Sequence, residues 1–331
     1  MITIWKQENK KLVEGCDKDT PCWVDARNVT REDIRILESE YHIAPEIIMD
    51  ILDQDELSRI EREDDFTLII VRLPIFLAAN EVSYFTIPVG ILLFPDRIIT
   101  ICWADCEVLH DITNNRVRGI SLSDLPAFVL RVLSRADLMY LRYLKEINRR
   151  SNTIELELQK SVRNLELIQL LNLEKSLVYF TTSLKSNQLL FEKLMKTRLI
   201  QLDEEDRDWL EDVATDNKQA IEMSEIYSNI LSGMMDAFAS VISNNLSIVM
   251  KRLTVISLVL MLPTLITSFY GMNVPLPMTG WGGYRAVLAI IALCIGSSVA
   301  AILLLVDKVP KKPKKIQSGR RRLKKRNRAI Q

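Results

Sequence analysis

The spacing of apolar residues changes along the chain, and residues 1–122 show the pattern of mixed strands and helices. Helix starts are indicated by Thr30 to Asp33, which is similar to a capping box, and by Pro45. A turn is indicated at Pro95. The strand candidates are short β-branched and aromatic runs, at residues 66–76, 82–87 and 90–102. We therefore predict an α/β domain over residues 1–122.

From residue 123 onward the apolar positions recur with a helical period. Residues 123–202 contain few helix breakers, which favours two long antiparallel helices. An acidic run after Leu202 then starts a further helical pattern, which continues from Glu204 to Tyr270. As one helix, it would be about 100 Å long at ~1.5 Å per residue. We predict a stalk helix and first membrane helix over residues 203–272.

A helix of that length cannot stand alone in water, because its apolar face must be covered by other helices of the chain or by other copies. One stripe of the helix has the alternating steps of four and three that are typical of a helix-bundle seam. The stripe consists of Tyr227, Leu231, Met234, Phe238 and Val241. This pattern predicts self-association.

Two segments near the end of the chain contain no charged residue, Leu253 to Tyr284 and Ala286 to Val306. Each is long enough to cross a bilayer, which takes about 20 residues. A Pro- and Gly-rich stretch separates them. We predict an external loop at residues 273–284, a second transmembrane helix at 285–307 and a basic cytoplasmic tail at 308–331.

The distribution of charge predicts the orientation of these spans. The formal net charge is zero, yet 12 of the 43 Lys and Arg residues lie between Lys308 and Arg328, which contains no acid. Lys251 and Arg252 precede the first uncharged segment, and the predicted loop has no basic residue. The positive-inside rule then places both termini in the cytoplasm of a multi-pass plasma-membrane protein, the inner membrane in a bacterium. The tail suits anionic lipid heads, and its lack of interleaved aromatic residues argues against nucleic acid.

Several function classes find no support in the composition. Five cysteines without a CxxC motif and two histidines favour neither a disulfide framework nor a structural zinc site. Cys102 and Cys106 are better explained as core residues than as metal ligands. No phosphate-binding loop, HExxH or GxSxG motif occurs. We therefore expect no enzymatic activity.

One face of the first predicted span is made of hydroxyl, thioether and small side chains. At 100° per residue these residues fall within about 120° of one another. They include Ser247, Met250, Leu253, Ser257, Met261, Thr264 and Ser268. Small and hydroxyl residues also occur where membrane helices pack closely, so the face alone leaves open whether it lines a passage or packs against a helix.

The segment Tyr270-Gly271-Met272-Asn273, followed by a short loop and one final span, resembles the signature of the CorA magnesium transporters. Trp23 to Asn28 is similar to an early strand of that family, and the segments around Ser243 and Val249 are similar to its entry into the membrane. The resemblance implies an α+β membrane protein that forms a homopentameric funnel. Each subunit would have an N-terminal cytoplasmic α/β domain and a long stalk helix that continues into the first of two transmembrane helices.

The resemblance also implies roles for individual residues. Gly271, Met272 and Asn273 would form the selectivity motif, with Asn273 ringing the external mouth. Asp50 and Asp212 match an intersubunit pair of carboxylates that binds regulatory Mg²⁺. The pore-lining positions would be Asp236, Ser247, Met250, Leu253, Ser257, Met261, Thr264 and Ser268, with an apolar constriction at Met250 and Leu253.

The implied function is passive, channel-type uptake of Mg²⁺, with Co²⁺ and Ni²⁺ as further candidate ions, and Mg²⁺ is also the regulatory ion. Several features depart from the family pattern, among them Met49, which replaces a Glu beside Asp50, and the loop after the signature, which has no acids. The missing loop acids leave the transported ion open. The alternatives are a transporter of zinc or another divalent cation on the same scaffold and a membrane-tethered sensor that conducts nothing.

Overall fold

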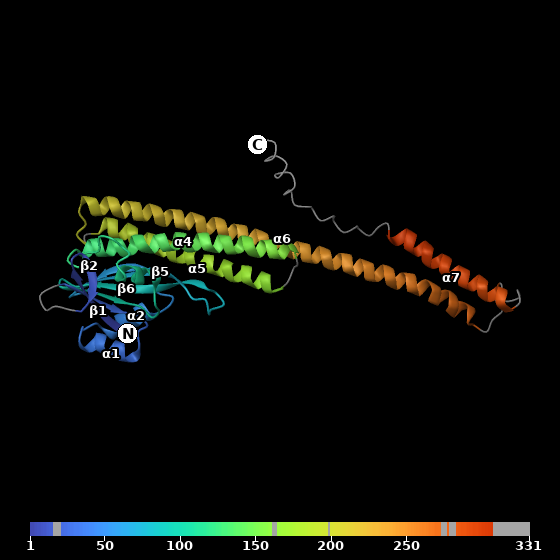
Figure 1. Ribbon diagram of the computed structural model, residues 1–331, viewed down its shortest axis with the longest axis horizontal. Helices are drawn as coiled ribbons and strands as arrows, with labels where there is room; N and C mark the ends of the chain where they lie inside the picture. The colour runs from blue at the N-terminus through green and yellow to red at the C-terminus, as the bar shows by residue number, and fades with distance from the viewer. Residues whose placement is uncertain (16–20, 161–163, 198, 273–276, 278–282, 307–331) are drawn as a thin grey trace, which may run out of the picture. The chain divides into compact units, whose positions relative to one another are not determined.

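The computed structural model describes residues 1–15, 21–160, 164–197, 199–272, 277 and 283–306 (Figure 1). The chain divides into two compact units, Met1–Phe238 and Ala239–Gln331. Helix α6 (Glu204–Tyr270) contributes residues to both. The predicted basic tail and most of the predicted external loop lie outside the described residues.

In the described part of the first unit, seven strands form one sheet in the order β2-β1-β3-β7-β6-β5-β4. Only the contact between β3 and β7 is parallel. The strands are β1 (Ile2–Glu8), β2 (Lys11–Glu14), β3 (Cys22–Ala26), β4 (Arg59–Arg62), β5 (Thr67–Phe76), β6 (Tyr84–Leu93) and β7 (Arg97–Ile101). The predicted turn at Pro95 joins β6 to β7.

The sequence pattern separates the strand candidates at residues 82–87 and 90–102. In the structure both contribute to the single strand β6, which continues through Pro88. Pro88 pairs with Arg72 of β5. The Arg72 backbone N–H donates to the Asn187 side chain and its carbonyl accepts from the Tyr140 hydroxyl, so neither group bonds to β6. The pair is therefore of the non-hydrogen-bonded type. On its other side, β6 pairs with β7 only from Gly90. The missing N–H of Pro88 thus removes no ladder hydrogen bond.

Helices α1 (Arg31–Ser39) and α2 (Pro45–Leu52) cover one face of the sheet. The predicted capping box of α1 is present, because the Asp33 carboxylate accepts from the Thr30 backbone N–H while the Thr30 hydroxyl accepts from that of Asp33. α2 lies very close to β6, since a Cβ at Gly90 would lie 2.4 Å from Ile51 Cδ1. This contact fixes the position of α2 on the sheet.

The opposite face carries the larger core, built with α3 (Glu107–Thr113), α4 (Leu125–Lys160), α5 (Asn164–Lys196) and α6 (Figure 1). The two long helices predicted from the periodicity are α4 and α5. Cys102 and Cys106 are buried in this core, and burial raises the pKa of both thiols. The strands alternate between the two cores: Ile69 and Val71 face α4 and α5, whereas Leu68 and Ile70 face α1 and α2.

The seam predicted on α6 is covered within the chain. Leu231 is buried, and Tyr227, Met234 and Phe238 pack against the core of their own unit. Val241 is exposed. The seam therefore gives no support to self-association, because the helices that cover it come from the same subunit. Sequence periodicity shows that the stripe needs a partner helix, but not whether that helix belongs to the same chain or to another copy.

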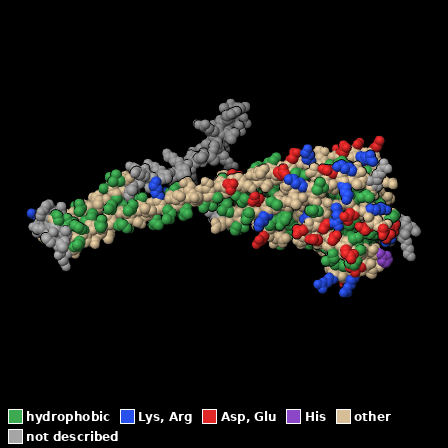
Figure 2. Space-filling view, turned by 180° about the vertical axis from the view of Figure 1, so that it is seen from behind, with side chains coloured by type: hydrophobic (Ala, Val, Ile, Leu, Met, Phe, Trp, Pro, Cys, Tyr) green, Lys and Arg blue, Asp and Glu red, His purple; other side chains and the backbone are tan. Residues whose placement is uncertain are grey.

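The second unit contains the end of α6 and α7 (Gly283–Val306). Both helices are long and apolar enough to cross a membrane. Pro263 cannot donate to the carbonyl of Val259, and the Ser298 hydroxyl of α7 lies 3.5 Å from that oxygen. In Figure 2, charged side chains gather on the first unit, and the visible part of the second unit has very few.

Asp137 of α4 is an unusual member of the larger core. It is fully buried, and neither carboxylate oxygen has a hydrogen-bond partner among the described residues. Burial, reinforced by the nearby charge of Asp216, raises its pKa well above the ordinary value. The folded protein therefore holds a proton at a pH where the unfolded chain has released it. Its stability falls as the pH rises above about 4, the ordinary pKa of Asp.

Asp137→Asn removes this ionisation and should stabilise the protein at pH 8 by about 1.4 kcal/mol or more, the equivalent of a pKa raised by one, because the unfolded variant no longer gains free energy from ionising this side chain. The advantage should disappear as the pH falls below 4, where the wild-type carboxyl is neutral in both states. Thermal unfolding of the purified protein at several pH values measures both effects. Glu222→Gln, at an exposed position of α6, is the matched control and should be neutral. An Asp137→Asn protein no more stable than wild type at pH 8 contradicts the prediction.

Candidate functional site

The predicted pore face of α6 is uncovered within one chain. All of Asp236, Ser247, Met250, Leu253, Ser257, Met261, Thr264 and Ser268 are exposed. The residues of α6 that are partly covered in the second unit are Val255, Val259, Pro263, Ile266 and Tyr270 among others, on the side that contacts α7. At 100° per residue, these two stripes lie about 180° apart. Helix α7 therefore leaves the predicted pore face uncovered.

The hydroxyl groups on this face donate to the backbone of their own helix. Ser247 Oγ donates to the Ser243 carbonyl at 3.0 Å, Ser257 Oγ to that of Leu253 at 3.0 Å, and Thr264 Oγ1 to that of Leu260 at 2.9 Å. This i−4 pattern uses the proton of each hydroxyl and leaves its oxygen lone pairs available. The face can thus accept hydrogen bonds from water, including the water of a hydrated cation.

α6 ends at Tyr270, and the Gly271 backbone N–H donates to the Thr267 carbonyl at 2.9 Å. The φ of Gly271 is outside the left-handed region, and a Cβ there would meet the carbonyls of Thr267 and Ser268 at 3.4 Å, an ordinary contact. The turn within one chain therefore does not require glycine. Met272 is exposed, and the predicted selectivity residue Asn273 lies outside the described residues.

The two predicted regulatory acids lie on different layers of the first unit. Asp50 is on α2, which packs on one face of the sheet, and Asp212 is on α6, which packs on the other. Both are exposed. Because the sheet separates α2 from α6 (Figure 1), one chain does not bring these carboxylates together around a single ion.

Asp50 has a partner that its sequence neighbourhood does not indicate. Arg59 Nη2 lies 2.9 Å from an Asp50 oxygen, and the same guanidinium also pairs with Glu56 and, at 3.2 Å, with Glu61. Three carboxylates thus surround one arginine. Asp50 is at the end of a helix and Arg59 begins a strand, so neither helical nor strand spacing could have linked them.

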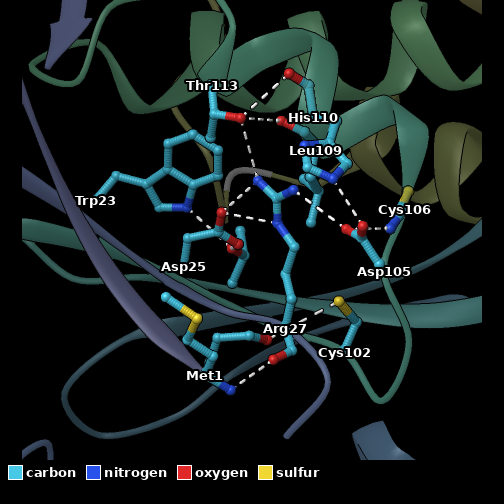
Figure 3. A network of polar contacts seen from close by, with 12 residues as sticks. Met1, Trp23, Asp25, Arg27, Cys102, Asp105, Cys106, Leu109, His110 and Thr113 are labelled. Atoms are coloured by element: carbon cyan, nitrogen blue, oxygen red, sulfur yellow. Dashed lines mark hydrogen bonds and ion pairs between the residues drawn. The ribbon is translucent and has the colours of Figure 1, made fainter. Parts of the chain in front are cut away.

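A second polar cluster explains the segment Trp23 to Asn28. The Trp23 Nε1–H donates to Thr100 Oγ1 at 2.9 Å, Thr100 donates to Asp25 at 3.0 Å, and Arg27 Nε donates to Asp25 at 2.9 Å (Figure 3). Arg27 also donates to the Asp105 carboxylate at 3.3 Å, and that carboxylate accepts from His110 Nε2 at 2.7 Å. These bonds join β3 to β7 and α3.

The electrostatics of this cluster favour a structural role. Burial raises the pKa of Asp25, opposed by hydrogen bonds from Arg27 and Thr100. Its carboxylate oxygens are therefore already occupied by donors from the chain. Among the described residues, no group of three or more His, Cys, Asp and Glu side chains is arranged to hold a metal ion.

These features define a class: a multi-pass membrane protein, with an α/β domain whose long helix continues into a two-span unit and carries a polar face along it. The chain belongs to the CorA family, since its residues 18–315 match the family described as CorA-like Mg²⁺ transporter protein. The predicted membership is thereby confirmed, and so is the predicted fold class of one subunit: an α/β domain and a long helix that continues into the first of two spans. The family consists of transporters, and the prediction that the chain is not an enzyme is confirmed as well.

Similar proteins cover most of the chain. A cobalt/magnesium transport protein CorA from Methanocaldococcus jannaschii is 29% identical over 76% of this chain and 79% of its own length. One from Thermotoga maritima is 24% identical over 88% of this chain and 82% of its own. The complete structure of the M. jannaschii CorA magnesium transporter superposes with a TM-score of 0.74 at 25% identity and covers 92% of this chain and 96% of that one.

Proposed function

We propose that this chain forms a homopentameric channel that takes up Mg²⁺ passively across the plasma membrane, with both termini in the cytoplasm. The observation that carries the proposal is the uncovered polar face of α6, opposite the side that contacts α7. A hydroxyl-bearing face is unfavourable toward lipid tails, whereas the apolar remainder of α6 and α7 suits them. Five copies with this face inward would enclose a wet passage and leave apolar surface toward lipid.

The mouth of this passage suits a hydrated ion. Mg²⁺ loses its water reluctantly, and side-chain carbonyl oxygens of an Asn273 ring can accept hydrogen bonds from that water. Below the mouth, the oxygens of Ser268, Thr264 and Ser257 continue the polar lining. Glycine at position 271 would allow neighbouring copies to approach closely, a requirement that the geometry of one chain does not impose.

The gate would lie at Met250 and Leu253, whose side chains are more than half exposed in one chain. Rings of such apolar side chains can close a pore by excluding water. Regulation would act at Asp50 and Asp212 of adjacent subunits. Mg²⁺ between them would join neighbouring domains, and its loss would leave like charges facing each other, which loosens the ring.

Mg²⁺ that binds Asp50 would compete with a cation already present. Arg59 pairs with Asp50, Glu56 and Glu61 together. The chain thus supplies an internal competitor for the regulatory ion, which sets the internal Mg²⁺ concentration needed for closure. This competition acts in the same direction as Met49, which stands where many family members have a further acid, because both weaken Mg²⁺ binding at Asp50.

Asn273→Ala should abolish Mg²⁺ flux and leave assembly intact, because it removes the proposed ring of side-chain oxygens and leaves the helices unchanged. Dye-reported Mg²⁺ influx into proteoliposomes measures flux, and size-exclusion chromatography measures assembly. Asn229→Ala, at an exposed position of the first-unit part of α6, should conduct normally. Wild-type flux in Asn273→Ala would contradict the role of the Asn273 ring. If the wild-type protein transports Zn²⁺ but not Mg²⁺, Zn²⁺ replaces Mg²⁺ as the transported ion.

Asp212→Asn should weaken inhibition by internal Mg²⁺, raising the half-inhibitory concentration by about 3- to 10-fold, because it removes one charged ligand of a hard cation. The measurement is flux into proteoliposomes against internal Mg²⁺ concentration. Glu222→Gln, also on an exposed part of α6, should leave inhibition unchanged. Equal inhibition of Asp212→Asn and wild type would reduce Asp212 to a solvated surface acid.

Arg59→Gln should have the opposite effect and lower the half-inhibitory concentration of internal Mg²⁺. The expected factor is about 1.5- to 5-fold, since partly exposed ion pairs are worth about 0.2–1 kcal/mol. The same flux titration measures it, with Arg35→Gln at an exposed position of α1 as the control. If Arg59→Gln raised that concentration instead, Arg59 would stabilise the closed ring rather than compete with the ion.

A further inference from the structure

The first unit contains an open pocket of about 730 Å³, between β5, β6, the connection that joins these two strands, and α5. This volume is in the range of small-molecule sites, roughly 300–1,000 Å³. The pocket is remote in sequence from the pore face, because all of its lining residues precede α6. Its wall combines a buried cation, aromatic rings and exposed acids.

The buried cation is Arg72, whose residue is only 8% exposed. Its guanidinium donates to Ser183 Oγ at 2.8 Å, to the Glu56 carbonyl at 2.5 Å and to Thr86 Oγ1 at 3.2 Å, all neutral acceptors. No carboxylate of the described chain lies within ion-pair distance of it. Burial lowers its pKa, and the charges of Asp55 and Asp53 oppose this without contact. A buried cation without a paired anion is unfavourable.

One donor in the pocket wall lacks an acceptor. The indole Nε1–H of Trp103 is buried and has no hydrogen-bond partner among the described residues. The Trp103 ring stacks on Phe85, with centroids 6.1 Å apart and planes 24° apart. The pocket therefore places a cation without a paired anion and an indole N–H without an acceptor beside a broad aromatic surface, the combination that holds an organic anion with an apolar body.

Asp55 and Glu81 are exposed residues of the same wall. They oppose the entry of a molecule with several negative charges, such as a nucleoside triphosphate. They also attract an ammonium group. Asp55 and Arg72 both line this pocket, so opposite charges lie on one wall, as the carboxylate and ammonium of an α-amino acid lie on one molecule.

We propose that this pocket binds a free amino acid with a large apolar side chain. Its carboxylate would accept from Arg72 and the Trp103 Nε1–H, its ammonium would lie near Asp55 or Glu81, and its side chain would pack against Phe85. The inference does not depend on ion conduction. It makes the α/β domain a receptor for an organic metabolite in addition to its proposed response to Mg²⁺.

Three probes with one phenylethyl body test the charges separately: phenylalanine, 3-phenylpropionate and phenethylamine. Titration calorimetry on the full-length protein in detergent should show the tightest binding for phenylalanine. Affinity for 3-phenylpropionate should be about 10-fold lower and phenethylamine should not bind, since charge-assisted hydrogen bonds carry the larger share. No binding of phenylalanine at millimolar concentrations, equal binding of all three, or tighter binding of 3-phenylpropionate would overturn the proposal.

Variants locate the binding. Val178→Glu puts a negative charge into the pocket from an exposed position of α5 and should abolish phenylalanine binding. Leu189→Glu, at an exposed α5 position outside the pocket wall, is the matched control and should bind normally. Trp103→Phe keeps an aromatic ring but removes the donor, and should weaken binding about 3- to 10-fold. Binding that survives Val178→Glu lies elsewhere and overturns the assignment, whatever the flux of the protein.

Discussion

The structure depends on one continuous helix that must be stable in two different surroundings. The first part of α6 packs its apolar residues against α4 and α5, and its last part is apolar on almost every side. A membrane offers no water to unpaired backbone groups, so each must find a partner in the protein. The helix meets this requirement by itself except at Pro263, and there Ser298 of α7 approaches the free carbonyl of Val259. The two spans are therefore complementary.

The same helix explains why a single chain is incomplete as a transporter. Within the first unit the apolar stripe of α6 is covered by its own chain, and in the second unit α7 contacts one side only. What remains uncovered is the face of hydroxyl and thioether groups. A face of this kind is suited to water, and only other copies of the chain can enclose water along it. Assembly in this view follows from the polar face, not from the seam at Tyr227 to Phe238.

Three arginines of the first unit show how differently the fold treats the same charge. Arg27 is paired with Asp25 and Asp105 and joins elements of the core. Arg59 holds three acids at the surface. Arg72 is buried with neutral partners alone. In the first arrangement every charge is paired. In the second, the acids can exchange Arg59 for another cation. In the third, the arginine lacks an anion. The first state is structural, and the regulatory and ligand-binding roles proposed above correspond to the second and third.

The sequence alone determined the features that depend on local spacing. Charge-free segments, the acidic start after Leu202 and the capping box at Thr30 predicted the spans, the long helix and α1, because hydrophobic period and helix capping act between residues close in the chain. The motif at Tyr270 to Asn273 predicted the family, which the comparisons confirmed. The roles of individual residues in the pore and at the regulatory acids stay predictions.

Only the tertiary structure decided which residues meet across elements. The strand through Pro88, the pairing of Asp50 with Arg59, the cover over the α6 seam and the pocket around Arg72 all join segments that are separate in sequence. A periodic pattern shows that a face needs a partner but carries no information on where that partner comes from. Contacts of this kind depend on packing and on the pairing of buried polar groups, which exist only once the chain has folded.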